Sequence, residues 1–318
     1  MNEINKAHNL NFLDNSIPDK SIQLLICDSP YYKVKGEFDF IWKTFDDYLQ
    51  DVEKWAIECK RILADNGTLF WYGDAKNIAY AQVIFDKHFC MINNITWEVF
   101  DRQTNKGIDQ FRCFAPVTER ILMYSNKSEP NKNVFQAVMD YIKNERLKCG
   151  WNYSQMDNFL NIKASSCFWD KETSHEYVIP TLEHWNKLQK TGNFHKEYEE
   201  LRKEYEELRK EYEELRRPFD NTHRLTDVMR FSQEGHITGK YDHDTVKPLK
   251  LSRVLIQTCS RKGDLVCIPF AGSGTECEAS IIESRKFVAF DIEKKYVDMT
   301  NKRVKPHLQQ QTIFDLGA

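Results

Sequence analysis

Four consecutive residues near the N-terminus have the groups needed to bind an amine. They are Asp28, Ser29, Pro30 and Tyr31, and they directly follow a short apolar run. A carboxylate and a neighbouring backbone carbonyl can accept both hydrogens of an amino group, while an aromatic side chain stacks on the ring that carries it. This arrangement suits an exocyclic amine, whose delocalised lone pair must be localised on nitrogen before it can attack. The alternative is an ordinary β-turn, which Asp-Ser-Pro also favours.

A glycine-containing loop near the C-terminus suits a nucleoside ligand. Its residues, between an apolar run and a helical pattern, are Pro269, Phe270, Ala271, Gly272, Ser273, Gly274 and Thr275. The glycines let the backbone approach a ligand, and Asp291, nineteen residues after Gly272, can accept both ribose hydroxyls. Cys277 stands at the third glycine position of a dinucleotide fingerprint, and no Gly-Lys-Ser/Thr follows, so neither that fingerprint nor a P-loop is complete. A plain tight turn is the alternative.

A third segment, from His243 to Pro248, lies directly before a helical pattern that extends to about residue 260. It contains Lys247, the last residue before the proline that would begin the helix. Pro248 is typical of the first position of a helix, because the missing N–H would have no helical partner there. This structural explanation holds whether or not the segment is functional.

Alternating strands and helices are predicted around these motifs. The apolar run 22–27 is typical of a strand covered on both faces, and Thr44 to Asp47 is a capping sequence for a helix that reaches about residue 62. Further strands are expected at 68–72, 94–97, 120–124, 265–267 and 287–290, and further helices at 78–85, 248–260, 275–283 and 294–303. Both terminal parts of the chain are therefore predicted to be α/β.

The middle of the chain is predicted to be mainly helical. Two amphipathic segments around Cys149 and Gly150 suggest a helix-turn-helix, with a generic helical hairpin as the alternative. Residues 196–216 are three identical KEYEELR heptads, in which Tyr and Leu recur at the spacing of a coiled-coil seam. Because three heptads are few, we expect this stripe to pack on its own domain and not on a second chain.

Composition restricts the class of protein. The chain has 45 Lys and Arg against 48 Asp and Glu, a net charge of -3, so no overall positive field attracts nucleic acid or an anionic membrane. Its nine cysteines form no Cys-x-x-Cys pair and no zinc-ligand spacing, which predicts reduced thiols, no metal site and a cytoplasmic location. Residues 1–10 are polar and lack the apolar core of a signal peptide, so none is expected there, and no apolar run approaches the roughly 18 residues of a membrane span.

Together and in this order, the three motifs resemble those of the β-class amino-methyltransferases of DNA. In that family the target-amine motif, usually Asp-Pro-Pro-Tyr, precedes the cofactor motif, usually Asp-Pro-Phe-x-Gly-Ser-Gly-Thr, and the target-recognition domain lies between them. The resemblance spans roughly residues 8–125 and 236–305 and includes the segment Thr-Glu-Arg-Ile-Leu at 118–122. It departs at Ser29, in place of the first proline, and at Ile268, where the family has an acid.

The resemblance implies a Rossmann-like α/β methyltransferase sheet with circularly permuted motif order and a mainly helical target-recognition insertion. Residues 1–128 would be the catalytic half and 236–318 the S-adenosylmethionine-binding half of the methyltransferase domain. Residues 129–235 would be the recognition domain, with the heptad helix at 196–217. Dimers are common in the family, so a homodimer and a cognate restriction endonuclease stay open as partners.

The resemblance also implies an activity, the transfer of a methyl group from S-adenosylmethionine to the N6 amine of an adenine flipped out of double-stranded DNA. Asp28 and the carbonyl of Ser29 or Pro30 would hold the amine, and Tyr31 would stack on the base. The residues that would contact the cofactor are Lys247, Pro248, Pro269, Phe270, Gly272, Ser273, Gly274, Thr275 and Asp291.

Contacts to DNA must then come from local groups. Candidates for phosphate are Lys33 and Lys35 beside the amine motif, and a cluster of Lys143, Arg146 and Lys148. The side chains that would read base edges are Asn152, Ser154, Gln155 and Asn158, with a solvated helix face as the alternative.

Three other functions stay open. In the family an Asp at the first motif position goes mostly with adenine and a Ser or Thr with cytosine N4, so a frame that starts at Ser29 would favour cytosine. A protein or small-molecule methyltransferase is disfavoured, because the related protein-glutamine enzymes have the opposite motif order. A non-catalytic DNA-binding relative would account for the departures at Ser29 and Ile268.

Overall fold

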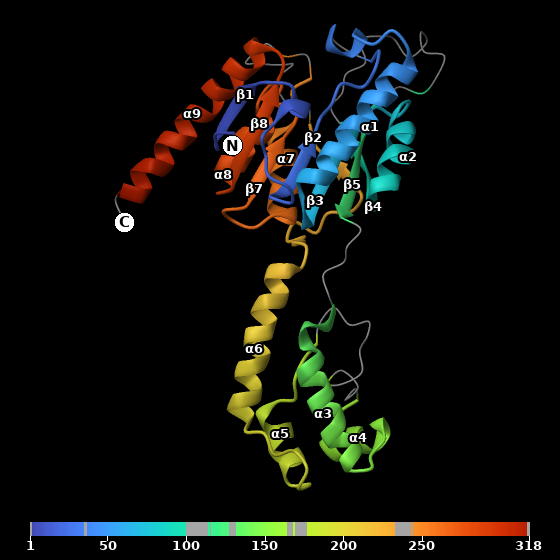
Figure 1. The fold of residues 1–318 in the computed structure, drawn as a ribbon, viewed down its shortest axis with the longest axis vertical. Helices are drawn as coiled ribbons and strands as arrows, with labels where there is room; N and C mark the ends of the chain where they lie inside the picture. The colour runs from blue at the N-terminus through green and yellow to red at the C-terminus, as the bar shows by residue number, and fades with distance from the viewer. Residues whose placement is uncertain are drawn as a thin grey trace. The chain divides into compact units, whose positions relative to one another are not determined.

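The computed structural model describes residues 2–34, 37–99, 114, 116–126, 132–163, 168, 177–232, 243 and 245–316. The chain divides into two compact units (Figure 1). The larger unit comprises Met1–Ser128 with Arg217–Ala318, and the smaller unit is Glu129–Arg216. The sequence analysis extended the insertion to residue 235. The smaller unit ends earlier, because the chain re-enters the sheet of the larger unit as strand β6 (Val228–Arg230).

The larger unit is built on an eight-stranded sheet. Its strands, in sheet order, are β1 (Lys6–Asn9), β8 (Lys286–Asp291), β7 (Leu265–Ile268), β2 (Ile22–Cys27), β3 (Leu63–Gly73), β5 (Thr118–Asn126), β4 (Phe89–Glu98) and β6. The pairs from β1 to β3 are parallel, β5 runs antiparallel to both neighbours, and β6 is parallel to β4. Strand β2 therefore lies between β3, which follows it in the sequence, and β7, which lies near the C-terminal end of the chain.

Helices cover both faces of this sheet (Figure 1). They are α1 (Phe45–Ile62) and α2 (Ile78–His88) on one face, and α7 (Leu249–Cys259), α8 (Thr275–Ile282) and α9 (Lys294–Leu316) on the other. Strand β2 contributes to both cores, since Leu25 and Cys27 pack with α1 whereas Leu24 and Ile26 pack with α7. This is the expected behaviour of a continuous apolar strand.

Of the helix ends predicted from local sequence, one is confirmed and two lie elsewhere in the structure. The Thr44 to Asp47 capping box is confirmed, because the Asp47 amide donates to Thr44 Oγ1 at 3.1 Å and the Thr44 amide donates to Asp47 Oδ2 at 3.0 Å. Pro248 is the N-cap residue of α7, and not its first helical residue. Helix α9 continues well beyond the expected end at 303, through Pro306 to Leu316.

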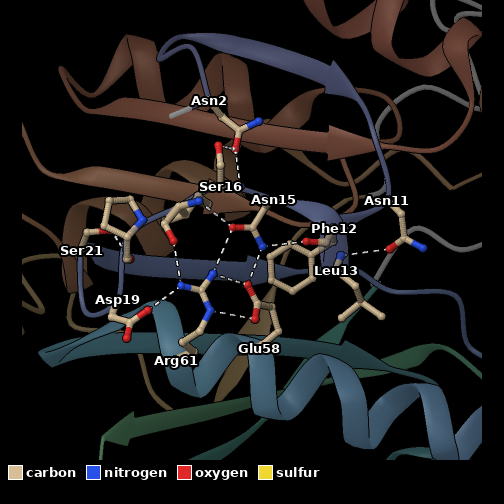
Figure 2. Close-up of polar contacts among 12 residues, drawn as sticks. Asn2, Asn11, Phe12, Leu13, Asn15, Ser16, Asp19, Ser21, Glu58 and Arg61 are labelled. Carbon is tan, nitrogen blue, oxygen red and sulfur yellow. Dashed lines mark hydrogen bonds and ion pairs between the residues drawn. The ribbon is translucent and has the colours of Figure 1, made fainter.

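The segment that leads into β2 is tied to α1 through one arginine. Figure 2 shows the Arg61 guanidinium between Glu58 on its own helix and the lead-in segment. It donates to Asp19 Oδ1 at 2.6 Å and to the Ile17 carbonyl at 2.8 Å. Asn15 joins the same network, since its amide donates to Glu58. These contacts fix the start of β2, and therefore the position of the amine motif at its end.

The smaller unit is helical in its described residues, with a 3-10 turn at Lys132–Phe135 and helices α3 (Gln136–Lys148), α4 (Tyr153–Leu160), α5 (Leu182–Gln189) and α6 (Tyr198–Leu215). Gly150, with φ +71°, makes the turn between α3 and α4. Trp185 and Phe194 lie at the centre of the core. The heptad stripe of α6 packs on this core, with Leu201 buried and its tyrosines partly buried, which confirms packing within one chain for this helix. In the described part of the chain, no helix is both long and apolar enough to cross a membrane.

Candidate active site

A cavity of about 1170 Å³ in the larger unit brings the three motifs together. Asp28 to Tyr31, Lys247 and the glycine loop all line it. The reason is topological: β2 and β7 are parallel neighbours, so their carboxyl ends open at the same edge of the sheet, where α/β proteins bind ligands. The volume exceeds the range of roughly 300–1,000 Å³ typical of a single small-molecule site. There is room for a nucleoside and a second flat ring.

The amine motif is fixed by residues that the sequence analysis did not select. The Tyr31 amide donates to Oδ1 of Asp39, which is buried, at 2.7 Å, and the Asn77 side chain donates to the Tyr31 carbonyl at 2.6 Å. Immediately afterwards Tyr32 and Lys33 have φ values of +63° and +55°, a left-handed conformation that is costly for residues with side chains. Asp39 and Asn77 act through the folded backbone, so no local sequence signal marks them.

The buried Lys247 forms a polar cluster in the wall of the cavity with Asp28, Tyr31 and Glu119, which are half-buried. The Tyr31 hydroxyl donates to Asp28 Oδ1 at 2.6 Å, and Lys247 Nζ lies 2.9 Å from the same oxygen. Lys247 Nζ is also 3.4 Å from Glu119 Oε2. Burial alone would lower the pKa of Lys247, but the charges of Asp28 and Glu119 outweigh it, so this pKa is raised and the side chain is a cation.

The hydroxyl of Tyr31 stays protonated in this cluster, because burial and the charge of Asp28 both raise its pKa. Its ring centroid lies 5.3 Å from Lys247 Nζ. The same nitrogen is only 3.1 Å from the Tyr31 hydroxyl, so the cation lies at the hydroxyl edge of the ring and does not cover its face.

A second buried acid, Glu276, lines the same cavity from the first turn of α8. It is 4% exposed, and its Oε1 accepts a hydrogen bond from the Ser252 hydroxyl at 3.0 Å. Burial and the nearby charge of Asp28 raise the pKa of Glu276. Glu276 has no sequence signal of its own, because an acid in a first helical turn is common near the positive end of the helix dipole. Glu119 lies within the segment 118–122 that belongs to the family resemblance, and no chemical role was expected for it.

The backbone of the glycine loop leaves no space for side chains. Gly272 and Gly274 have φ values of +47° and +75°. A Cβ on Gly274 would lie 2.7 Å from Thr300 Oγ1 and 2.9 Å from its Cα, and one on Gly272 would lie 3.0 Å from His243 Nε2. From helix α9, Arg303 Nη1 donates to the Ser273 carbonyl at 3.0 Å and to Thr275 Oγ1 at 2.9 Å. The loop is thus held closely on α9.

Asp291 ends strand β8 beside this loop. Its Oδ2 accepts from the Gly272 amide and its Oδ1 from the Glu293 amide, each at 2.9 Å. Burial raises the pKa of Asp291, and these two hydrogen bonds oppose the increase. The carboxylate lines the cavity, so it can also accept hydroxyls of a ligand there.

The other expected cofactor residues divide into two groups. Pro269, Phe270 and Ser273 line the cavity, so they stay candidates for contact with a cofactor. The residues outside its lining are Pro248, Gly274 and Thr275. Gly274 and Thr275 shape the loop, whereas Pro248 caps α7.

The expected DNA-binding residues lie in both units. Lys33 is exposed, and Lys35 lies outside the described residues. Asn152 and Gln155 bond each other in a capping box at the start of α4, so their side-chain oxygens are engaged there. Ser154 and Asn158 are exposed.

One expected phosphate contact in the smaller unit is wrong. Arg146 is 6% exposed and donates to the Trp151 carbonyl at 2.8 Å. Its side chain therefore stabilises the turn after α3 and is not available to a phosphate. The neighbouring Lys148 pairs with Glu145 at 2.6 Å.

Comparisons with known proteins agree with this geometry. A family model described as "DNA methylase" matches residues 22–302. The type II methyltransferase M.HinfI of Haemophilus influenzae is 23% identical over 91% of this chain and 65% of its own length. The DNA adenine methyltransferase YhdJ of Escherichia coli (strain K12) is 23% identical over 91% of this chain and 78% of its own. The solved structure of the cytosine-N4-specific PvuII DNA methyltransferase shares the fold with a TM-score of 0.52 and 11% identity, covering 94% of this chain and 88% of that one.

Proposed function

The chain belongs to the DNA methylase family of S-adenosylmethionine-dependent enzymes, and from this premise we propose that it methylates the N6 amine of adenine at a specific sequence in double-stranded DNA. The observation that carries the proposal is one cavity lined by Asp28 to Tyr31 at one end and by the glycine loop with Asp291 at the other. Adenine is favoured by Asp28 at the first motif position, which in this family goes mostly with adenine. The name of the relative YhdJ, a DNA adenine methyltransferase, points the same way.

The glycine loop fits S-adenosylmethionine. A Cβ at Gly272 would fill the space between the loop and His243, so the backbone is open to a ligand only because this residue is glycine. Asp291 would hold the ribose hydroxyls, and Phe270 and Ser273 would contact the rest of the nucleoside. When bound, the cofactor supplies an activated methyl group for in-line transfer to nitrogen.

The amine motif would prepare the target nitrogen. Asp28 accepts one amine hydrogen and the carbonyl of Ser29 or Pro30 the other, which localises the lone pair on nitrogen toward the methyl group. The bound cofactor would supply the methyl group, and one amine hydrogen would leave the nitrogen as a proton on the side that Asp28 and this carbonyl hold. Most of the rate enhancement would come from this positioning.

The target base must leave the duplex to reach this cavity. Unstacking and unpairing cost a few kcal/mol, and stacking on Tyr31 would recover roughly 1–3 kcal/mol. We assign sequence readout to the smaller unit, where Ser154 and Asn158 expose a hydroxyl and an amide on α4.

Methylation of cytosine N4 is the second candidate, and Ser29 favours it. Its hydroxyl is buried and donates to the Pro30 carbonyl at 3.3 Å, inside the motif where cytosine enzymes have Ser or Thr. The same cavity would accept either base.

The test is modified-base sequencing of DNA from a methylation-deficient host that expresses the chain. Expression of the wild type should give N6-methyladenine at one recognition sequence. The Asp28→Ala variant should give none, and Asp46→Ala, which removes an exposed acid at the start of α1, should give the wild-type pattern. N4-methylcytosine instead would establish the second candidate. If no base is modified and calorimetry finds no S-adenosylmethionine binding with or without DNA, the chain is a non-catalytic relative.

A further inference from the structure

Lys247 is enclosed at the amine motif and does not extend along the glycine loop. Its nitrogen lies 2.9 Å from Asp28 Oδ1, 3.1 Å from the Tyr31 hydroxyl and 3.4 Å from Glu119 Oε2. The side chain is 4% exposed, and the ring centroids of Tyr31 and Tyr72 are each 5.3 Å from its nitrogen. These contacts surround the ammonium with groups of the amine motif and its supporting strands.

The contacts to Asp28 converge on one carboxylate oxygen. Both the Tyr31 hydroxyl and Lys247 Nζ approach Oδ1, and no other described residue bonds to Asp28. With Oδ1 held from two directions, the plane of the carboxylate is fixed. Oδ2 is then the oxygen available to an incoming amine.

Glu119 supports Lys247 from β5, on the far side of β3 from the motif. Its Oε2 is buried and has no hydrogen-bond partner among the described residues, so the charge of Lys247 at 3.4 Å is what compensates it. Sharing the cation between two carboxylates also leaves Asp28 only partly neutralised, and a carboxylate with more negative charge is the better acceptor for an amine hydrogen.

We infer that Lys247 and Glu119 are a positioning pair for Asp28, which hold its Oδ1 so that Oδ2 receives the hydrogen of the target amine. This inference rests on the proposed amine methylation and deepens it. It also moves Lys247 from the cofactor end of the site, where the family resemblance put it, to the amine end.

Five titratable groups surround Asp28 and Lys247. They are Cys27 at the end of β2, Tyr31 from the loop after β2, Glu119 from β5, Tyr72 from β3 and Glu276 from α8. Removal of the one cation makes the carboxylate easier to protonate, whereas removal of one acid makes it harder. The two members of the pair should therefore move the acid limb of the pH–rate profile in opposite directions.

The experiment measures kcat, KM and the pH profile of methyl transfer from labelled S-adenosylmethionine to DNA of a methylation-deficient host, with the Kd of S-adenosylmethionine from calorimetry. Lys247→Met should lower kcat about 100–1,000-fold, the usual effect of removing one preorganised polar contact, and change the cofactor Kd less than about threefold. Its acid limb should move to higher pH. Glu119→Gln replaces the side chain with one of the same shape. It should lose less activity than Lys247→Met, and the acid limb of its pH–rate profile should move to lower pH. Lys250→Met, which removes an exposed lysine three residues further on in the first turn of α7, is the matched control and should behave as wild type.

Two results would overturn the inference. One is a cofactor Kd that rises tenfold or more in Lys247→Met while kcat is kept, because Lys247 would then hold the cofactor. The other is an acid limb that Glu119→Gln leaves unmoved or moves to higher pH, and this variant answers the question even if Lys247→Met does not fold. Failure of the proposed function is a separate outcome, in which the wild type transfers no methyl group to DNA.

Discussion

Replacement of Gly274 by alanine tests whether the glycine loop is shaped by close packing on α9. Gly274 has φ +75°, and an added Cβ would lie 2.7 Å from Thr300 Oγ1, 2.9 Å from Thr300 Cα and 3.0 Å from its Cβ. The left-handed backbone costs alanine roughly 1–2 kcal/mol. Overpacking costs about 1–3 kcal/mol more, because Thr300 is fully buried in a helix and its Cα cannot turn away. We expect Gly274→Ala to lower the free energy of unfolding by about 2–5 kcal/mol.

Gly263→Ala separates the two contributions. Gly263 has φ +85°, yet nothing lies within 4 Å of the position where its Cβ would be. This variant should lose only the backbone cost, about 1–2 kcal/mol. Any gain from the lower entropy of the unfolded alanine chain is common to both variants and cancels. The difference of about 1–3 kcal/mol between them is the cost of the contact with Thr300.

Urea denaturation of the full chain measures both values, and calorimetry with S-adenosylmethionine shows whether the loop is displaced. Gly274→Ala should weaken cofactor binding, and Gly263→Ala should not. If both variants lose the same stability, the close approach to Thr300 contributes nothing, and the reasoning is refuted.

Two further substitutions test the buried charges. Arg303→Met should lower the free energy of unfolding, measured in urea, by about 3–5 kcal/mol, because it removes the guanidinium that lies 2.6 Å from the buried Glu278. Arg253→Met breaks a more exposed ion pair and should lower it by at most about 1 kcal/mol. Equal losses in the two variants would argue that burial does not make the Arg303 pair more important. Glu276→Gln should stabilise the fold at neutral pH. The raised pKa of Glu276 means that folding disfavours its ionised form. This cost to stability is absent below the unfolded-state pKa and grows as pH rises through the folded-state pKa. Its advantage over wild type should therefore be larger at pH 7 than at pH 4, and an advantage independent of pH would contradict this account.

The elements predicted well from the sequence are those with local causes. The helix that begins after Thr44 has both hydrogen bonds of its capping box within four residues, and the strand 22–27 is apolar throughout. The end of α9 has no such signal. The helix expected at 294–303 continues in the structure through Pro306 to Leu316.

The site was predictable as a set of motifs, while the partner of each side chain was not. Lys247 lies next to Pro248 in the sequence, and both were assigned to the cofactor. The direction of the Lys247 side chain depends on Asp28 and on Glu119, residues more than a hundred positions away. Their strands, β2 and β5, come to lie on either side of β3 only in the folded sheet. Asp39 was missed for the same reason, because its role is a hydrogen bond to the folded backbone of Tyr31.

The insertion point of the smaller unit has a consequence for how such a chain can change its specificity. Residues 129–216 are inserted in the larger unit between β5 and β6, which both pair with β4. None of the described residues of this insertion lines the cavity. A different helical segment spliced between residues 128 and 217 would leave untouched every group that lines the cavity. On the proposal that the smaller unit reads the DNA sequence, recombination at these two positions would change the target sequence and leave the described residues of the cavity as they are.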